Sequence, residues 1–148
     1  MDTDQILELR TLVQKFIRLF GLLDPSVTPC GYPLSVSQVL ALQELEKQTL
    51  TVGELSDKLH LERSSVSRLV DSLVKAGFVR REVNEKNRRE VLLFLTEKGK
   101  NSIGTVRTQS VRYYQSILNG LSNQQQQQIL QSFRMFTDSL SKMRGESE

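Results

Sequence analysis

The chain has 148 residues, of which 38% are hydrophobic, 6% aromatic and 25% charged, and its formal net charge is +3 at pH 7. This composition fits one soluble, helix-rich domain, and the charge is too small to indicate a nucleic acid partner by itself. The single cysteine, Cys30, excludes an intrachain disulfide and a multi-thiolate metal site. The acidic start lacks a signal-peptide pattern, and no apolar stretch approaches the ~20 residues of a membrane span. We expect a cytoplasmic protein without a metal, a cofactor or a membrane partner.

The first predicted element is an amphipathic helix. Between Ile6 and Leu23, apolar residues recur at spacings of three and four, which is the stripe of a helix with one buried face. Asp24 followed by Pro25 is expected to end this helix, because the residue before a proline is pushed out of the helical region. Residues 24–34, which contain three prolines and a glycine, predict a connecting loop.

Capping residues predict four further helices. A serine or threonine followed three residues later by glutamine or glutamate can satisfy two otherwise unpaired amide groups at a helix start. Three such pairs are Ser35 with Gln38, Thr51 with Glu54, and Ser122 with Gln125, and Thr96 is a fourth cap. They predict helices near 36–47, 52–59, 97–119 and 123–143. The glutamine run 124–128 is interpreted as the exposed start of the last helix, because it leads directly into an apolar stripe.

Residues 51–96 have the order of a winged helix-turn-helix. After the short helix 52–59, His60 lies at a turn, and Leu61 is expected to fill the core beneath it. A second helix is predicted from about Arg63 to Gly77. Two β-rich segments, 78–83 and 90–95, flank a polar, basic tip and predict a hairpin. Residues 63–89 contain eight basic and three acidic residues, a net charge of +5, so positive charge gathers in this part of the chain.

The outer face of the second helix is suited to reading DNA. Arg68 can bond guanine bidentately in the major groove, and the small serines allow close approach and contacts with phosphates. Arginines at a hairpin tip can enter the minor groove, and a lysine there can bind phosphate. The candidate DNA-binding residues are Arg63, Ser64, Ser65, Ser67, Arg68, Lys86, Arg88 and Arg89. Taken singly, the helix face and the hairpin could each be merely solvated surface, but together they favour DNA binding.

Three long helices carry apolar faces that a small winged helix cannot cover alone. A symmetric homodimer is one solution, and an intrachain helical bundle is the other. We expect a fold that is mainly α with a small β-hairpin wing, built as a single domain, 1–148. Within it, residues 35–96 form the winged helix-turn-helix, and residues 1–34 and 97–148 form a helical dimerisation part.

Several motifs in this chain resemble the multiple-antibiotic-resistance regulator (MarR) family. The matching segments are Leu55–Asp71, Lys75–Arg81, Asn87–Arg89 and Leu95–Gly99. The resemblance implies a bacterial homodimeric transcription regulator, usually a repressor, that binds a palindromic operator and is released by a small molecule or an oxidant. Three positions depart from the family pattern. Asn87 replaces the wing aspartate, His60 stands where glycine is common, and Glu62 replaces a better helix cap.

Aromatic and apolar residues are the candidates for an effector site. Family members often bind aromatic acids, so a small aromatic or hydrophobic effector is possible, and candidate lining residues are Phe16, Phe20, Leu42, Tyr113 and Tyr114. Each of them also fits a core or interface position. Cys30 offers an alternative, a redox-sensing regulator, although no basic residue lies nearby in sequence to activate the thiol. His60 is interpreted as structural, with pH sensing as its alternative.

Other functional classes find little support in the residues. One histidine and one cysteine, thirty residues apart, make a weak case for a nucleophilic site, and no phosphate-binding glycine loop or metal-ligand spacing is present. We therefore expect that the protein is not an enzyme. A winged helix used as a protein-interaction module remains the competing possibility.

Overall fold

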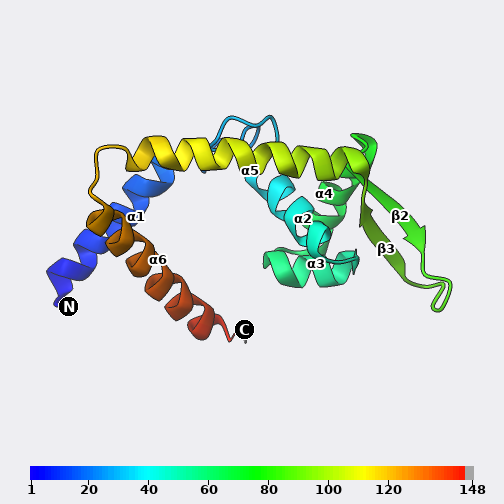
Figure 1. Ribbon diagram of the computed structural model, residues 1–148. Coiled ribbons are helices and arrows are strands. Elements are labelled where there is room, and N and C mark those ends of the chain that lie inside the picture. Colours follow the sequence, from blue (N-terminus) through cyan, green and yellow to red (C-terminus); the bar gives the residue numbers. More distant parts are fainter. Residues whose placement is uncertain (146–148) are drawn as a thin grey trace. The chain divides into compact units, whose positions relative to one another are not determined.

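The computed structural model describes residues 1–145, and the chain divides into two compact units, residues 1–111 and the residues from 112 onward. The elements are α1 (Thr3–Phe20), α2 (Val36–Lys47), β1 (Leu50–Thr51), α3 (Val52–Leu59), α4 (Arg63–Lys75), β2 (Val79–Val83), β3 (Val91–Leu95), α5 (Glu97–Leu118) and α6 (Asn123–Arg144) (Figure 1). Within residues 1–145, six helices and one small antiparallel sheet confirm the fold class expected from the sequence.

Helix α1 begins and ends three residues earlier than the sequence predicted. Asp2 caps it, because the Asp2 carboxylate accepts the amide of Gln5 and the Gln5 side chain accepts the amide of Asp2. The predicted end at Asp24 is wrong. The helix ends at Phe20, because Gly21 adopts the left-handed conformation (φ 83°) at low cost and its amide bonds the last turn.

The other predicted caps are confirmed. Ser35, Thr51 and Ser122 each form the reciprocal pair with the residue three positions on. The Thr96 hydroxyl accepts the amide of Gly99 at 3.1 Å, at the start of α5. The glutamine run lies in the first turns of α6, as the apolar stripe after it indicated.

The sheet contains one strand that the sequence analysis did not predict. Its order is β1-β3-β2, and both pairings are antiparallel. The hairpin register runs from Val79 opposite Leu95 to Val83 opposite Val91, as the two β-rich segments predicted. β1 has only two residues, Leu50 and Thr51, too few to show an alternating pattern.

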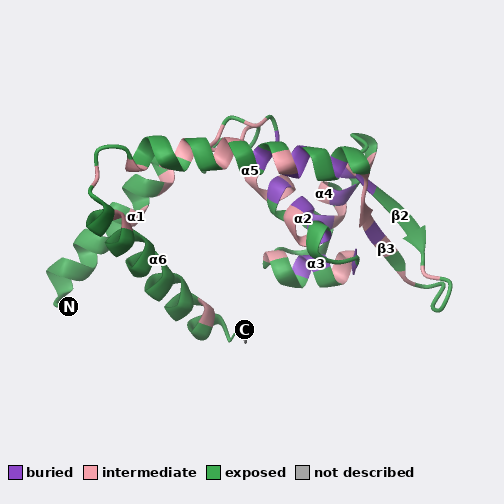
Figure 2. Cartoon of the chain, in the orientation of Figure 1, coloured by how far each residue is buried: buried purple, intermediate pink, exposed green. Residues whose placement is uncertain are grey.

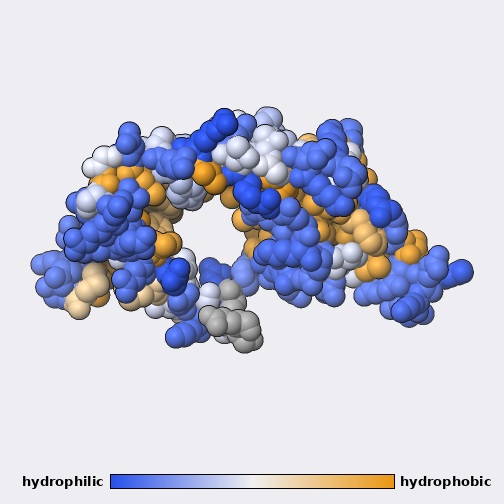
Figure 3. All heavy atoms as spheres, in the orientation of Figure 1, coloured by the Kyte–Doolittle hydropathy of each residue, from blue (hydrophilic) through white to orange (hydrophobic). Residues whose placement is uncertain are grey.

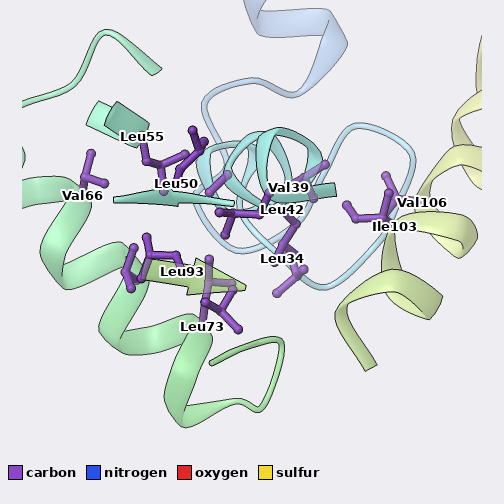
Figure 4. Packing of buried hydrophobic residues seen from close by; sticks show 14 residues of the cluster. Leu34, Val39, Leu42, Leu50, Leu55, Val66, Leu73, Leu93, Ile103 and Val106 are labelled. Atoms are coloured by element: carbon purple, nitrogen blue, oxygen red, sulfur yellow. The ribbon is translucent and has the colours of Figure 1, made fainter. Parts of the chain in front are cut away.

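The hydrophobic core of the first unit lies among α2, α3, α4, the sheet and the first turns of α5. Figure 4 shows leucine and valine side chains from these elements pointing toward one another. The fully buried large residues are Leu42, Leu55, Val66, Val70, Leu73, Leu93 and Ile103. Leu61 does not fill the core as predicted: it is 41% exposed, because the turn after α3 carries it outward. Helix α5 is further tied to α2 by an Arg107–Glu46 ion pair of 2.7 Å.

Helices α1 and α6 contain no buried residue, although both carry apolar stripes (Figure 2). Side chains such as Leu12, Leu130 and Phe133 are about half exposed, and apolar atoms are visible at the surface of both helices in Figure 3. Exposed apolar surface of this extent marks an interaction site. Among the described residues, no helix is long and apolar enough to cross a membrane.

Candidate nucleic-acid interface

Helix α4 buries one face and leaves the other free. Val66, Val70 and Leu73 are in the core. Ser64, Arg68 and Asp71, spaced four and three residues apart, are exposed together on the outer face. Ser65 is also exposed, whereas Ser67 is half-buried. The structure therefore brings Arg68 and the serines to one end of an accessible helix, as a major-groove reader requires.

The turn before α4 is built around His60. His60 adopts the left-handed conformation (φ 53°) and closes α3 through its amide, which bonds carbonyls in the last turn of that helix. It is the one non-glycine residue with positive φ among residues 1–145. This position explains the histidine structurally, since histidine tolerates that region better than most residues. Glu62 begins α4 without a side-chain cap, so the first amides of α4 lack a side-chain acceptor from their N-cap.

Arg63 lies against α3. A Cβ atom built on Gly53 would fall 2.8 Å from Nη2 of Arg63, so the guanidinium lies close over Gly53 and would have to shift to accommodate a larger residue there. This contact joins the first turn of α3 to the first turn of α4. A polar hollow adjoins it, lined by Ser56, Asp57, His60, Leu61, Glu62, Arg63 and Ser65. The sequence analysis placed Arg63 among the DNA-binding residues but did not predict its contact with Gly53.

The wing tip is organised by two asparagines. The Asn84 side chain accepts the Lys86 amide at 3.1 Å and donates to the Glu90 carboxylate at 2.8 Å. Asn87 accepts the Arg89 amide at 3.3 Å, so it holds the backbone of the tip in place of the ion pair that an aspartate would make with the arginine side chain. Across residues 1–145, no ion pair involves Lys86, Arg88 or Arg89, and all three are exposed. Their positive charge is available to a polyanion.

An ion pair that the sequence analysis missed joins the wing to the recognition helix. The Arg81 guanidinium in β2 bonds the Asp71 carboxylate in α4. This pair compensates the one carboxylate on the outer face of α4, which would otherwise repel phosphate. Next to it, the Arg80 guanidinium lies 4.6 Å from the centre of the Phe94 ring and also pairs with Glu82. Arg80 and Arg81 therefore organise the hairpin.

The candidate effector residues fall in both units. Phe16 and Phe20 stack at 4.9 Å on α1, and Tyr113 and Tyr114 meet edge-on at 6.2 Å in the second unit. Leu42 is fully buried in the core, the role that the sequence left open for it. A pocket that gathers these side chains stays a prediction. Among the described residues, no group of histidine, cysteine, aspartate or glutamate could hold a metal ion.

Cys30 lies in a hydrogen-bonded loop, partly buried. Burial raises the pKa of the thiol. Hydrogen bonds with Thr28, whose Oγ1 is 3.2 Å from the sulfur, and with Ser110 lower the pKa, and the net result is a pKa below the usual value. No basic residue lies near Cys30 in sequence, and the hydroxyl groups that stabilise the thiolate instead come together only in the folded chain.

We expect Cys30 to be alkylated with a pH midpoint below that of an unperturbed cysteine, because the thiolate is the reacting form and its pKa is lowered. Thr28→Val should move the midpoint up, since it removes a hydrogen bond at nearly constant volume. The rate of iodoacetamide labelling against pH measures both. Ser26→Ala, in the same loop but bonded to Asp24, is the control. An unchanged midpoint in Thr28→Val would refute the assigned cause.

The fold and the exposed basic surfaces define a winged helix-turn-helix protein. Residues 32–90 match the model of the MarR family, and the chain is a MarR-type winged-helix protein. The chain is 37% identical over 70 residues to the HTH-type transcriptional regulator PapX of Escherichia coli, a match covering 47% of this chain and 43% of PapX. It is 28% identical over 105 residues to the transcriptional repressor MprA of E. coli strain K12, covering 71% of this chain and 60% of MprA.

A solved structure supports the assignment over nearly the whole length. The structure of a MarR family protein from Bacillus stearothermophilus superposes with a TM-score of 0.78 at 28% identity, covering 95% of this chain and 99% of that one. The chain spans 43% and 60% of the lengths of PapX and MprA. Both relatives are named as regulators of transcription.

Proposed function

We propose that this protein is a sequence-specific DNA-binding transcription regulator that acts as a repressor. It would bind a palindromic operator as a homodimer and leave the DNA when a small molecule binds. The observation that carries this proposal is the pairing of an exposed, arginine-bearing face on α4 with an exposed wing tip that holds three uncompensated cations. The names of the relatives agree with regulation of transcription, and that of MprA agrees with repression.

The two basic surfaces have different tasks in this proposal. Arg68 would read base edges in the major groove, where a bidentate arginine–guanine contact distinguishes bases. Arg88 and Arg89 would follow the minor groove beside it, and Lys86 would bind a phosphate. Arg63, seated on α3, would reach the backbone at the edge of the major groove.

The homodimer rests on the exposed apolar helices. α1 and α6 carry apolar stripes without one buried residue, and a second copy of the chain is the most economical cover for them. A two-fold dimer would present two α4 helices about one helical turn apart, ~34 Å, to successive major grooves. The effector would be a small aromatic or hydrophobic molecule, because the candidate residues around α1 and α5 are aromatic.

Salt dependence separates DNA binding from the competing protein-interaction module. We expect the logarithm of the affinity for duplex DNA to fall steeply and linearly with the logarithm of salt concentration, because each neutralised phosphate releases counterions. Fluorescence anisotropy of a labelled duplex over a range of salt measures this slope. An affinity that hardly changes with salt, or no affinity for any duplex, would contradict the proposal and favour a protein partner.

Lys86→Ala should weaken binding to specific and random duplexes by the same factor and reduce the salt slope by about one. The reason is that an exposed lysine at the wing tip contacts phosphate, which carries no sequence information. Lys47→Ala, remote in sequence from the wing and paired with Glu44 on α2, is the matched control. A loss confined to the specific duplex would show that Lys86 reads bases instead.

A redox-sensing regulator that uses Cys30 is the second candidate. The lowered thiol pKa and the partial exposure of Cys30 favour it. In that case peroxide, rather than a small aromatic molecule, would release the DNA, and Cys30→Ser would abolish the response.

A further inference from the structure

The first turn of α5 is seated directly on the turn between α4 and β2. The Lys98 ammonium donates to the carbonyl of Ala76, the last residue of the α4 cap, at 2.6 Å. The same ammonium lies 4.6 Å from the centre of the Phe78 ring. A cation at the carboxyl end of a helix is stabilised by the helix dipole and by the unpaired carbonyls there. Lys98 is therefore attached to the end of the recognition helix.

Thr96 and Gly99, on either side of Lys98 in the chain, also pack closely against the turn between α4 and β2. The Thr96 hydroxyl lies 2.7 Å from the Gly77 carbonyl and 3.1 Å from the Phe78 carbonyl. Gly99 is packed so tightly that an added Cβ would lie 2.3 Å from the Phe78 carbonyl oxygen. Thr96 and Gly99 hold the turn, whereas Lys98 alone among the three bonds the cap of α4.

We infer that Lys98 is a positioning residue for DNA binding: it fixes the angle of α4 against α5, and hence the spacing between half-sites that the dimer accepts. This inference rests on the proposed function. Further along, α5 is anchored to α2 through Ile103, Val106 and the Arg107–Glu46 pair, so its own position within the first unit is set independently of Lys98. Helix α5 also continues beyond residue 111 toward the segment proposed for dimerisation.

Because α4 is long, a small tilt about its carboxyl end displaces its amino end by several ångströms. α4 has 13 residues, so it is about 20 Å long at 1.5 Å per residue. Tilting it by about 10° at its carboxyl end would move its amino end, near Ser64, by roughly 3 Å, and Arg68 in the middle of the helix by roughly 2 Å. The displacement of the amino end is close to the ~3.4 Å rise of one base pair. Loss of the Lys98 bond should therefore reduce the difference in affinity between duplexes with different half-site spacings, while the protein still binds DNA.

Lys100 provides a matched control. It lies two residues further along the same helix, is also exposed, and pairs with Glu97 of its own helix at 2.9 Å. Replacing Lys98 or Lys100 with methionine removes the same charge and leaves a side chain of similar length. Lys98→Arg keeps a donor that can reach the Ala76 carbonyl, so it should rescue the preference.

The test uses the full chain and its selected operator, together with duplexes whose central spacer is longer or shorter by one base pair. We expect the wild type, Lys98→Arg and Lys100→Met to discriminate these spacers by about 10-fold or more, and Lys98→Met by only about 2- to 3-fold. Uniform weakening on all duplexes, equal in Lys98→Met and Lys100→Met, would overturn the inference, because it would show a general charge effect.

A distance measurement without DNA tests whether Lys98 fixes the position of α4 relative to α5. In a Cys30→Ser background, spin labels at Ser64 and Thr105 report the distance between α4 and α5, in protein diluted with unlabelled chain. Lys98→Met should broaden the distance distribution, and Lys100→Met should not. A distance distribution in Lys98→Met as narrow as that of the wild type would overturn the inference. Broadening, if the unlabelled wild-type protein binds no duplex, would uphold the positioning role of Lys98 within the fold and refute the proposed function.

Discussion

Replacing Arg68 with alanine is expected to weaken binding to the selected operator about 5- to 150-fold, which corresponds to ~1 to 3 kcal/mol. Arg68 is exposed on the face of α4 opposite the core, and no ion pair within residues 1–145 occupies its guanidinium. It is therefore available for a bidentate contact with a guanine. Titration of the operator and of single-base variants of it measures the loss and identifies the base pair at which specificity is relaxed.

Lys75→Ala is the matched control for Arg68→Ala. Lys75 lies on the same helix and is also exposed, but it belongs to the last turn, away from the end that would contact bases. It should affect specific and random duplexes alike. If Arg68→Ala also weakened both kinds of duplex by the same factor, Arg68 would be a phosphate contact and its assigned role in base recognition would be wrong.

Replacing Ile129 with glutamate is expected to separate the dimer into single chains. Ile129 lines an apolar groove on α6 with Leu121 and Phe133, and it is 39% exposed within one chain. In a two-fold interface each copy would bury one unpaired carboxylate. At ~2 kcal/mol for each, the dissociation constant should rise about 1000-fold. Sedimentation over a concentration series measures this change, and operator affinity should fall with it.

Gln131→Glu supplies the control for Ile129→Glu. Gln131 is two residues away on the same helix, is polar and exposed, and receives the same added charge. It should leave the assembly intact. A dimer that tolerates Ile129→Glu, or a wild-type chain that sediments as a monomer at all concentrations, would refute the proposed interface and favour another partner for α1 and α6.

Local sequence rules predicted most helix and strand boundaries well, because most of those boundaries have their own chemical signal. Thr51 and Ser122 cap helices that begin at the next residue, and the hairpin has the predicted strands. The rules were wrong for α1, where Gly21 ended the helix before Pro25 could. They were also wrong for Leu61, because helical spacing does not say which way a turn residue faces.

Contacts between distant residues could not be predicted from one sequence. The Asp71–Arg81 pair, the Arg63–Gly53 contact and the Lys98–Ala76 bond each join two elements whose relative placement only the fold fixes. The role of Asn87 is similar. Its replacement of an aspartate was visible in the sequence, but its bond to the Arg89 amide depends on the conformation of the tip.

The most direct test of the account is selection of bound sequences from a random duplex pool, followed by measurement of the protein-to-DNA ratio on the winning sequence. We expect a two-fold symmetric site, with half-sites about one helical turn apart, occupied by two chains. No enriched sequence, or an asymmetric site occupied by a single chain, would contradict the proposal that this winged helix-turn-helix protein reads DNA as a homodimer.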